Sequence, residues 1–153
     1  MQDTFERLIK SLGKLLNASL HVDANQSCTL LIEEKITVQI EKDHQEKGYI
    51  IGAMVATLPP GKFREEVLKN ALQANHFFPK MGTFGYSAHN NQLALFYLVK
   101  DPDISAEKFA EVLSAFVAKA LEWKQALEQN QSAPSSFMDQ SEPVKPPPFP
   151  FKS

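Results

Sequence analysis

The first half of the chain changes from a helical hydrophobic period to the period of strands. Over residues 4–17, large apolar side chains recur three and four positions apart, which predicts an amphipathic helix. Asp3 and Glu6 form a capping-box pattern at its start. Apolar and polar side chains then alternate in four short runs, near residues 20–22, 28–32, 36–40 and 49–55. This pattern predicts four consecutive antiparallel strands joined by short polar turns.

The second half predicts a helix, a hairpin and a last helix. Pro59 to Gly61 end the fourth strand, because proline cannot donate a ladder hydrogen bond. Helical spacing resumes over residues 62–77, and a hairpin and a helix follow, near residues 84–86, 92–99 and 105–128. The fold class that we expect is α+β: a twisted antiparallel sheet of five to six strands with three flanking helices, in the order α-β-β-β-β-α-β-β-α.

Residues 129–153 differ in composition from the rest of the chain. They hold most of the ten prolines and few aliphatic side chains, so they offer little apolar surface to offset the entropy of ordering. We therefore expect a single domain over residues 1–128 and a disordered tail over residues 129–153 that is dispensable for folding. Two P-x-x-P matches, at residues 143–146 and 147–150, could dock in an aromatic groove. Such matches are common, so a plain flexible tail is the favoured interpretation.

Charge and composition exclude several classes of function. The formal net charge of −2 gives no basic field for nucleic acid, which we do not expect as a partner. A single cysteine, Cys28, excludes an intrachain disulfide and favours a reducing compartment such as the cytoplasm. No run of 18 apolar residues could span a bilayer, so membrane insertion is not expected either.

The sequence shows no cluster of residues that would predict catalysis. The four histidines are isolated from one another, at positions 21, 44, 76 and 89, and none pairs with cysteine or glutamate at metal-ligand spacing. The six glycines are too dispersed for a phosphate-binding loop. Cys28 alternates with Leu30 and Ile32, which favours a buried cysteine. We expect no enzyme activity, no catalytic residue, no metal and no cofactor, although a small enzyme with a site assembled from distant residues stays an alternative.

The order of elements and several local motifs resemble the Tir chaperone (CesT-like) family, the class I type III secretion chaperones. The resemblance covers residues 4–128, and within the class it extends to the chlamydial chaperones that serve several effectors. The proline-rich tail departs from the family pattern. The motifs are, in chain order, F-x-x-L-I-x-x-L-G-x-x-L from Phe5, C-T-L-L-I-E-E-K-I-T-V-Q-I from Cys28, L-P-P-G from Leu58, A-L-Q-A-N from Ala71, G-Y-S-A-H-N-N-Q-L-A-L-F-Y from Gly85, and F-x-x-x-A-x-x-W-K-x-x-L from Phe116.

The resemblance implies a homodimeric, ATP-independent chaperone of the bacterial cytoplasm. Such a protein binds the N-terminal region of secreted effector proteins, keeps that segment non-globular and aids its delivery to the secretion apparatus, with the secretion ATPase as a further candidate partner. A non-enzymatic dimeric α+β adaptor of an unrelated pathway is the alternative.

Two sets of apolar residues are candidate binding surfaces. The first helix and the neighbouring strands could bind the client, by apolar contacts and by addition of a strand to an open sheet edge. The second predicted helix and the hairpin after it could form the dimer interface. In both cases the alternative is that the residues fill the core of one protomer. The client-binding candidates are Phe5, Leu8, Leu12, Leu16, Leu31, Ile36, Val38 and Ile40, and the dimer-interface candidates are Val67, Ala71, Asn75, Phe77, Phe78, Phe84 and Tyr86.

Overall fold

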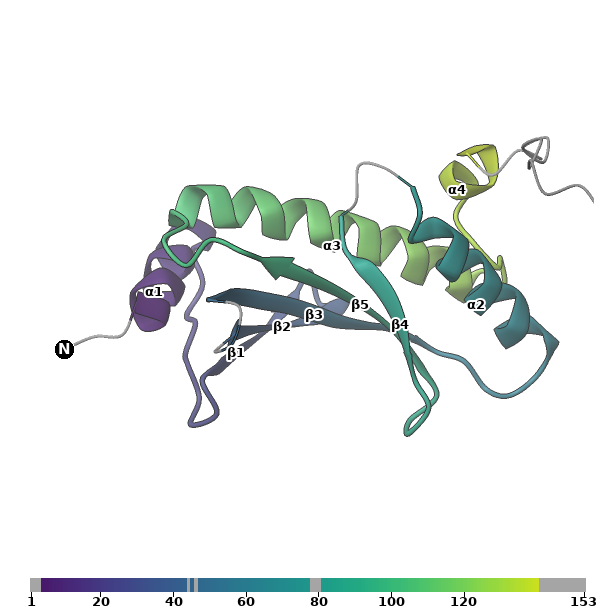
Figure 1. Cartoon of the computed structure of the whole chain (residues 1–153), viewed down its shortest axis with the longest axis horizontal. Coiled ribbons are helices and arrows are strands. Elements are labelled where there is room, and N and C mark those ends of the chain that lie inside the picture. Colours follow the sequence, from purple (N-terminus) through teal and green to yellow (C-terminus); the bar gives the residue numbers. More distant parts are fainter. Residues whose placement is uncertain (1–3, 44, 46, 78–80, 141–153) are drawn as a thin grey trace, which may run out of the picture.

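A computed structural model describes residues 4–43, 45, 47–77 and 81–140 of the chain. Helices and strands follow one another in the order expected from the hydrophobic pattern, with one strand fewer and one short helix more (Figure 1). The elements are α1 (Thr4–Leu16), β1 (Ser27–Ile32), β2 (Ile36–Asp43), β3 (Gly48–Thr57), α2 (Lys62–Ala74), β4 (Thr83–Ser87), β5 (Gln92–Val99), α3 (Ala106–Glu128) and α4 (Ser135–Gln140).

The strands form one antiparallel sheet in the order β1-β2-β3-β5-β4. The hairpin of β4 and β5 folds back so that β5 pairs with β3 and β4 becomes an edge strand. The register places Leu30 opposite Val38 and Ala53 opposite Leu95, so that apolar residues of successive strands face the same side. The sheet therefore has one apolar face and two edges, β1 and β4.

Helices α1 and α3 cover the apolar face of the sheet (Figure 1). Helix α3 crosses mainly over β3 and β2, and α1 packs beside it. The ring of Tyr49 in β3 lies between the ring of Phe5 in α1, at 5.7 Å, and that of Phe109 in α3, at 6.0 Å. The centre of the core thus joins both helices to the sheet, and its burial is the main favourable term in folding.

Helix α2 lies against the other end of the sheet and is fixed there by polar side chains. At its first turn, Arg64 donates to the Tyr86 hydroxyl at 2.9 Å and to Asn91 Oδ1 at 3.2 Å. Just after its last turn, the Asn75 amide bonds to both main-chain groups of Phe84, accepting from N–H at 2.8 Å and donating to C=O at 3.2 Å. These contacts hold the two ends of α2 against the β4–β5 hairpin.

The prediction of a strand near residues 20–22 is wrong, although the five strands observed agree with the expected five to six. Residues 18–23 form an irregular connection, in which Leu20 and Val22 are half-buried against the core. Two apolar residues that alternate with polar ones, Leu20 and Val22, do not form a strand unless a neighbouring strand supplies hydrogen-bond partners for their main chain. The outer side of β1, which such a strand would need, is bonded at Ser27 by Asp23.

The packed chain does not end at residue 128, where the composition places the domain boundary. Ala133, Pro134 and Phe137 are buried, and α4 begins at Ser135. The ring of Phe137 anchors this segment, because it packs on Phe77 and Trp123. The expected disorder of residues 141–153 lies outside the described residues.

Candidate functional site

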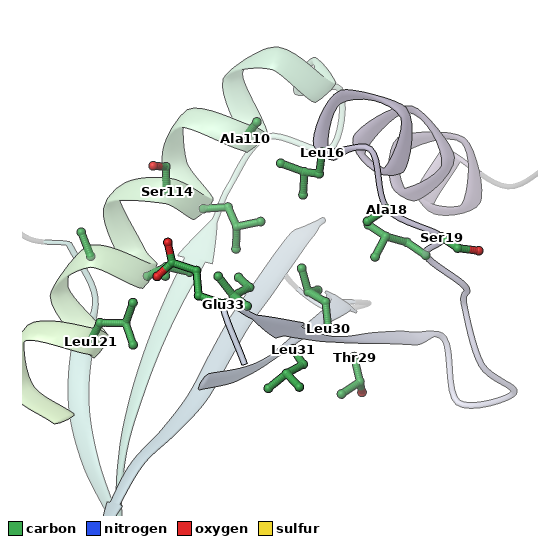
Figure 2. Close-up of a pocket in the computed structure, with 15 residues that line it drawn as sticks. Leu16, Ala18, Ser19, Thr29, Leu30, Leu31, Glu33, Ala110, Ser114 and Leu121 are labelled. Carbon is green, nitrogen blue, oxygen red and sulfur yellow. The ribbon is translucent and has the colours of Figure 1, made fainter. Parts of the chain in front are cut away.

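A groove of about 750 Å³ opens between α1, β1 and α3 (Figure 2). It exists because α3 lies mainly over β3 and β2, which leaves the inner face of β1 incompletely covered. Glu33 is the only charged residue of its lining, so the groove suits an apolar segment. The lining residues are Leu16, Ala18, Ser19, Leu20, Thr29, Leu30, Leu31, Ile32, Glu33, Ala110, Leu113, Ser114, Val117, Ala118 and Leu121.

The groove wall at the C-terminus of α1 is held in place by the turn that caps this helix. Asn17 has a positive φ of 52°, and the N–H of Ala18 bonds to the carbonyl of Gly13 at 2.9 Å. The turn brings Ala18 so close that a Cβ on Gly13 would lie 2.8 Å from the Ala18 oxygen. Gly13 is therefore needed for this approach, which directs the chain from Ala18 to Leu20 along the groove.

The outer edge of β1 runs along the groove and is free in its middle. At Ser27 both main-chain groups bond to Asp23 instead of β2, the N–H through Asp23 Oδ1 at 3.1 Å and the carbonyl through the Asp23 N–H at 2.8 Å. Because outward-pointing groups alternate along an antiparallel strand, the main chains of Thr29 and Leu31 also face outward. The described part of the chain places no partner on them. An extended segment could pair there.

The opposite edge of the sheet is closed. The main-chain groups of Phe84 that face away from β5 are the ones that Asn75 bonds. Helix α2 contacts β4 on the same side. Of the two edges, β1 is thus the one that offers main-chain groups to a partner.

The structure places most of the expected client contacts in the core. Leu16 and Leu31 line the groove and are 42% and 62% exposed, and Figure 2 shows the side chain of Leu31 pointing away from α3 while that of Leu30 points into the groove. The other six candidates belong to the core, because they lie on the stripe of α1 and the face of the sheet that α3 covers. These buried residues are Phe5, Leu8, Leu12, Ile36, Val38 and Ile40.

Sequence reasoning missed the far wall of the groove. Leu113, Val117 and Leu121 recur every four residues on α3 and line it. Their spacing is visible in the sequence, but the same spacing is typical of a core stripe. What distinguishes them is the position of α3 relative to β1, which is a property of the tertiary structure.

The expected dimer-interface residues pack within one protomer. Val67, Ala71 and Phe84 are buried, where α2 meets β4. The half-buried ones contact neighbours of the same chain: Asn75 bonds Phe84, Phe77 packs on Phe137, and Tyr86 bonds Arg64 and Asn91. Phe78 lies outside the described residues. Apart from Leu31 in β1, the large apolar side chains of the described residues that are exposed on α2 and the sheet are Leu72, Met54 and Phe96.

Two titratable groups near the start of β1 have shifted pKa values. Burial raises the pKa of the Cys28 thiol, as expected for a cysteine inside the sheet. The hydrogen bond from the Ser27 N–H lowers the pKa of Asp23 and thus stabilises the carboxylate that holds the start of β1. Among the described residues, no group of three or more histidine, cysteine, aspartate or glutamate side chains could hold a metal ion.

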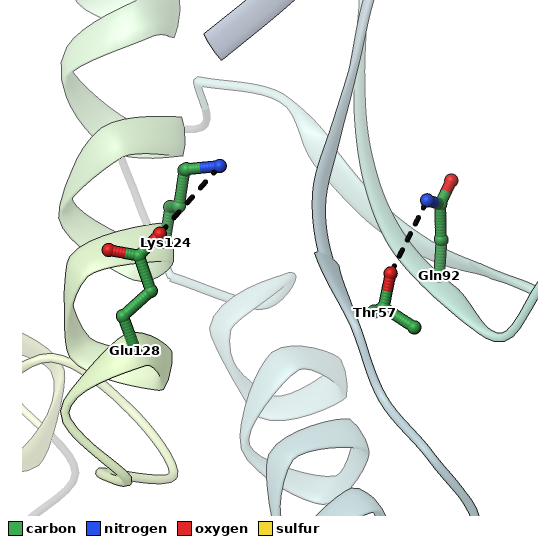
Figure 3. A network of polar contacts seen from close by, with 4 residues as sticks. All are labelled: Thr57, Gln92, Lys124 and Glu128. Atoms are coloured by element: carbon green, nitrogen blue, oxygen red, sulfur yellow. Dashed lines mark hydrogen bonds and ion pairs between the residues drawn. The ribbon is translucent and has the colours of Figure 1, made fainter. Parts of the chain in front are cut away.

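Polar contacts elsewhere support the scaffold (Figure 3). Gln92 donates to the Thr57 hydroxyl across β5 and β3 at 3.5 Å, and Lys124 pairs with Glu128 one turn along α3 at 3.8 Å. Exposed ion pairs of this kind contribute little to stability. Within the described part of the chain, no helix has the length and apolar character that crossing a membrane requires.

Comparison with solved structures identifies the fold. A chain of the HopA1–SchA chaperone–effector complex matches with a TM-score of 0.67 and 11% identity, over 80% of this chain and 94% of that one. A chain of the ExsC–ExsE complex matches with a TM-score of 0.63 and 21% identity, over 78% and 90%. The complex of the Yersinia pestis type III secretion chaperone SycH with a fragment of YscM2 gives a TM-score of 0.59 and 18% identity, over 76% and 97%.

Comparison with protein families identifies the chain at the level of sequence. No curated protein matches it. The profile of the Tir chaperone protein (CesT) family, however, matches residues 7–124, a range that runs from the first turn of α1 to the last turns of α3 and contains the groove and both sheet edges. With the family's profile matched over most of its length, the chain belongs to the Tir chaperone protein (CesT) family.

Proposed function

We propose that the chain is an ATP-independent type III secretion chaperone that binds an N-terminal segment of secreted effector proteins and keeps it non-globular. The observation that carries the proposal is the free outer edge of β1 at Thr29 and Leu31, next to an apolar groove. Two of the similar solved structures are described as complexes of a chaperone, one with an effector and one with a fragment of YscM2, and a third is described as the ExsC–ExsE complex. The proposed place of action is the bacterial cytoplasm.

The geometry supports two kinds of contact with a client, one through the main chain of β1 and one through the side chains of the groove. A client segment in extended conformation would pair with the main chain of Thr29 and Leu31, which gives affinity without demanding one sequence. Its alternate side chains would enter the groove against Leu30, Leu113 and Val117. Such binding needs no catalytic step, so we propose that the chain is not an enzyme.

We further propose that the chaperone is a homodimer, as the family resemblance implies. Leu72 on α2 is 64% exposed, and Met54 and Phe96 on the open face of the sheet are 46% and 45% exposed. Exposed apolar side chains of this size supply surface that a twofold contact would bury. The interface would therefore use the outer sides of α2 and of the sheet, in place of the buried residues first expected.

Co-expression with N-terminal fragments of candidate secreted proteins tests the proposal. A chaperone should co-purify with such a fragment and raise its solubility, and the same fragment should bind when presented unfolded. An adaptor of another pathway would bind only a folded partner, which would contradict the proposed function. The control is a fragment from the C-terminal domain of the same secreted protein, which should stay unbound.

A further inference from the structure

The chain reverses direction directly after α3. The N–H of Gln131 bonds back to the carbonyl of Ala126 at 2.9 Å, and Asn130 has a positive φ of 62°. The residues that follow lie beside α2 and the end of α3, at the opposite end of α3 from α1 (Figure 1). This segment therefore contacts the end of α3 that lies away from α1.

One aromatic side chain anchors the segment. Phe137 is 4% exposed, and its ring centroid lies 5.4 Å from that of Phe77 and 5.6 Å from that of Trp123. Trp123 in turn packs on Phe84 at 4.5 Å, so the anchor rests on a row of aromatic side chains contributed by the turn after α2, by α3 and by β4. Aromatic anchors in such pockets dominate the energetics of peptide recognition.

Polar side chains hold the segment at its rim. Asn70 of α2 donates to both the carbonyl oxygen and the hydroxyl of Ser132, at 3.1 and 3.0 Å. The hydroxyl of Ser136 donates to Glu122 of α3. An aromatic anchor surrounded by a few polar contacts is the arrangement of a bound peptide in its groove.

The segment lies outside the range that the family profile matches. The family profile ends at residue 124, before the segment begins. The sheet and the core around Phe5, Tyr49 and Phe109 are formed by elements that precede it. Removing it would uncover Trp123 and Phe77 and leave this core in place.

We propose that residues 132–137 form a removable strap, and that the aromatic groove beneath it is a second peptide-binding site, which the chain's own C-terminal segment occupies in cis. Phe77, Phe84 and Trp123 form its floor, and Asn70 forms its rim. The site accepts a short segment with one aromatic anchor and a hydroxyl-bearing residue five positions before it. In the chain's own segment the anchor is Phe137 and the hydroxyl-bearing residue is Ser132. It is independent of the proposed client groove.

Trp123 is the only tryptophan of the chain, so its fluorescence reports the state of the strap directly. Phe137→Ala in the full chain should raise acrylamide quenching of Trp123 severalfold and shift its emission to the red, while the far-UV circular dichroism stays native. Ser135→Ala, at an exposed position of the same segment, should change neither. A synthetic peptide of residues 129–140 should restore the low quenching of the Phe137→Ala variant, and the same peptide with alanine for Phe137 should not.

Three results would overturn the proposal: unchanged quenching in Phe137→Ala, loss of native circular dichroism in that variant, or failure of the peptide to restore protection. A second measurement uses the unmodified chain. A removable strap opens without global unfolding, so the amide of Phe137, which bonds to the carbonyl of Pro134 at 3.0 Å, should exchange with solvent much faster than the amides of α3 near Phe116. Equal exchange rates would show that the segment is an integral part of the core.

Discussion

Asn75 bonds with its side-chain amide to both outward-facing main-chain groups of Phe84, as one residue of a neighbouring strand would. Asn75→Ala should lower the free energy of unfolding by about 1–3 kcal/mol, because it leaves a donor and an acceptor of a buried residue without partners. Urea denaturation measures the change. Gln73→Ala, at an exposed position of α2, is the control and should stay close to the wild type. Equal stability of the two variants would contradict the role given to Asn75.

The turn between β1 and β2 has a backbone conformation that its residues disfavour. Glu33 and Glu34 have positive φ angles of 53° and 56°, and the N–H of Lys35 bonds to the carbonyl of Ile32 at 2.9 Å, as in a type I′ turn. Glu34→Gly should therefore raise the free energy of unfolding by roughly 0.5–1 kcal/mol, since glycine adopts this conformation without steric cost. A thermal melt would show it, and a lower melting temperature would contradict the account.

At the residue scale, the sequence correctly predicts which side chains form the apolar faces of helices and strands. The alternation of Cys28 and Leu30 and the helical spacing of Phe5, Leu8 and Leu12 correctly indicate apolar faces. They cannot indicate whether a face is covered, because a core stripe and an open binding stripe have the same spacing. The client-binding candidates were chosen from such stripes, so six of them proved to be core. The bond of Asn75 to Phe84 depends on the position of α2 against β4, which local pattern does not contain.

At the scale of the element, the hydrophobic period predicts most helices and strands correctly. The expected helices over residues 4–17, 62–77 and 105–128 agree closely with α1, α2 and α3. The failures lie where the local pattern is short. The run at residues 20–22 pairs with no described strand. Helix α4 is anchored by the tertiary packing of Phe137, which no hydrophobic periodicity indicates.

Helix α1 offers a matched pair of variants for the groove. Leu15 and Leu16 are neighbours with similar exposure, 49% and 42%, but Leu16 lines the groove and Leu15 does not. Leu16→Ser should weaken binding of an effector fragment in a pull-down while leaving the melting temperature nearly unchanged, because both positions are already half in water. Leu15→Ser should leave both properties unchanged. Equal loss of binding in the two variants would place the client elsewhere.

A third variant separates binding from folding. Leu12 is fully buried, and Leu12→Ser should cost about 2–5 kcal/mol, as large core truncations do. Its loss of client binding should follow its loss of structure. If Leu16→Ser were as unstable as Leu12→Ser, the groove wall would be part of the core and its effect on binding would be indirect.

For the whole molecule, the proposed homodimer gives the next test. Light scattering at micromolar concentration should give twice the mass of the chain. Leu72→Glu should shift the protein to the monomer without loss of helical circular dichroism, because a carboxylate would be buried in the interface. Gln73→Glu, one position along and also exposed, should stay dimeric. A monomeric wild type would contradict the dimer, and a dimeric Leu72→Glu variant would contradict the interface.

The asymmetry of the sheet edges is the property of the whole molecule on which the chaperone proposal depends. The β4 edge is closed by Asn75 and α2, whereas the middle of the β1 edge is free beside the groove. The sequence could predict an antiparallel sheet and, through the resemblance, its family. The open edge is β1 because α2 packs against the other edge, β4. The position of α2 is a property of the tertiary structure, which the local sequence pattern does not contain.

The most direct test of the account is amide hydrogen exchange of the chaperone with and without a bound effector fragment. The account predicts that client binding slows exchange at the amides of Thr29 and Leu31, which point to the free edge, and changes little at Leu30, which already pairs with β2. The amide of Phe84, bonded to Asn75, should exchange at the same rate in both states. A complex in which Thr29 and Leu31 exchange as fast as in the free chain would contradict client binding at the β1 edge.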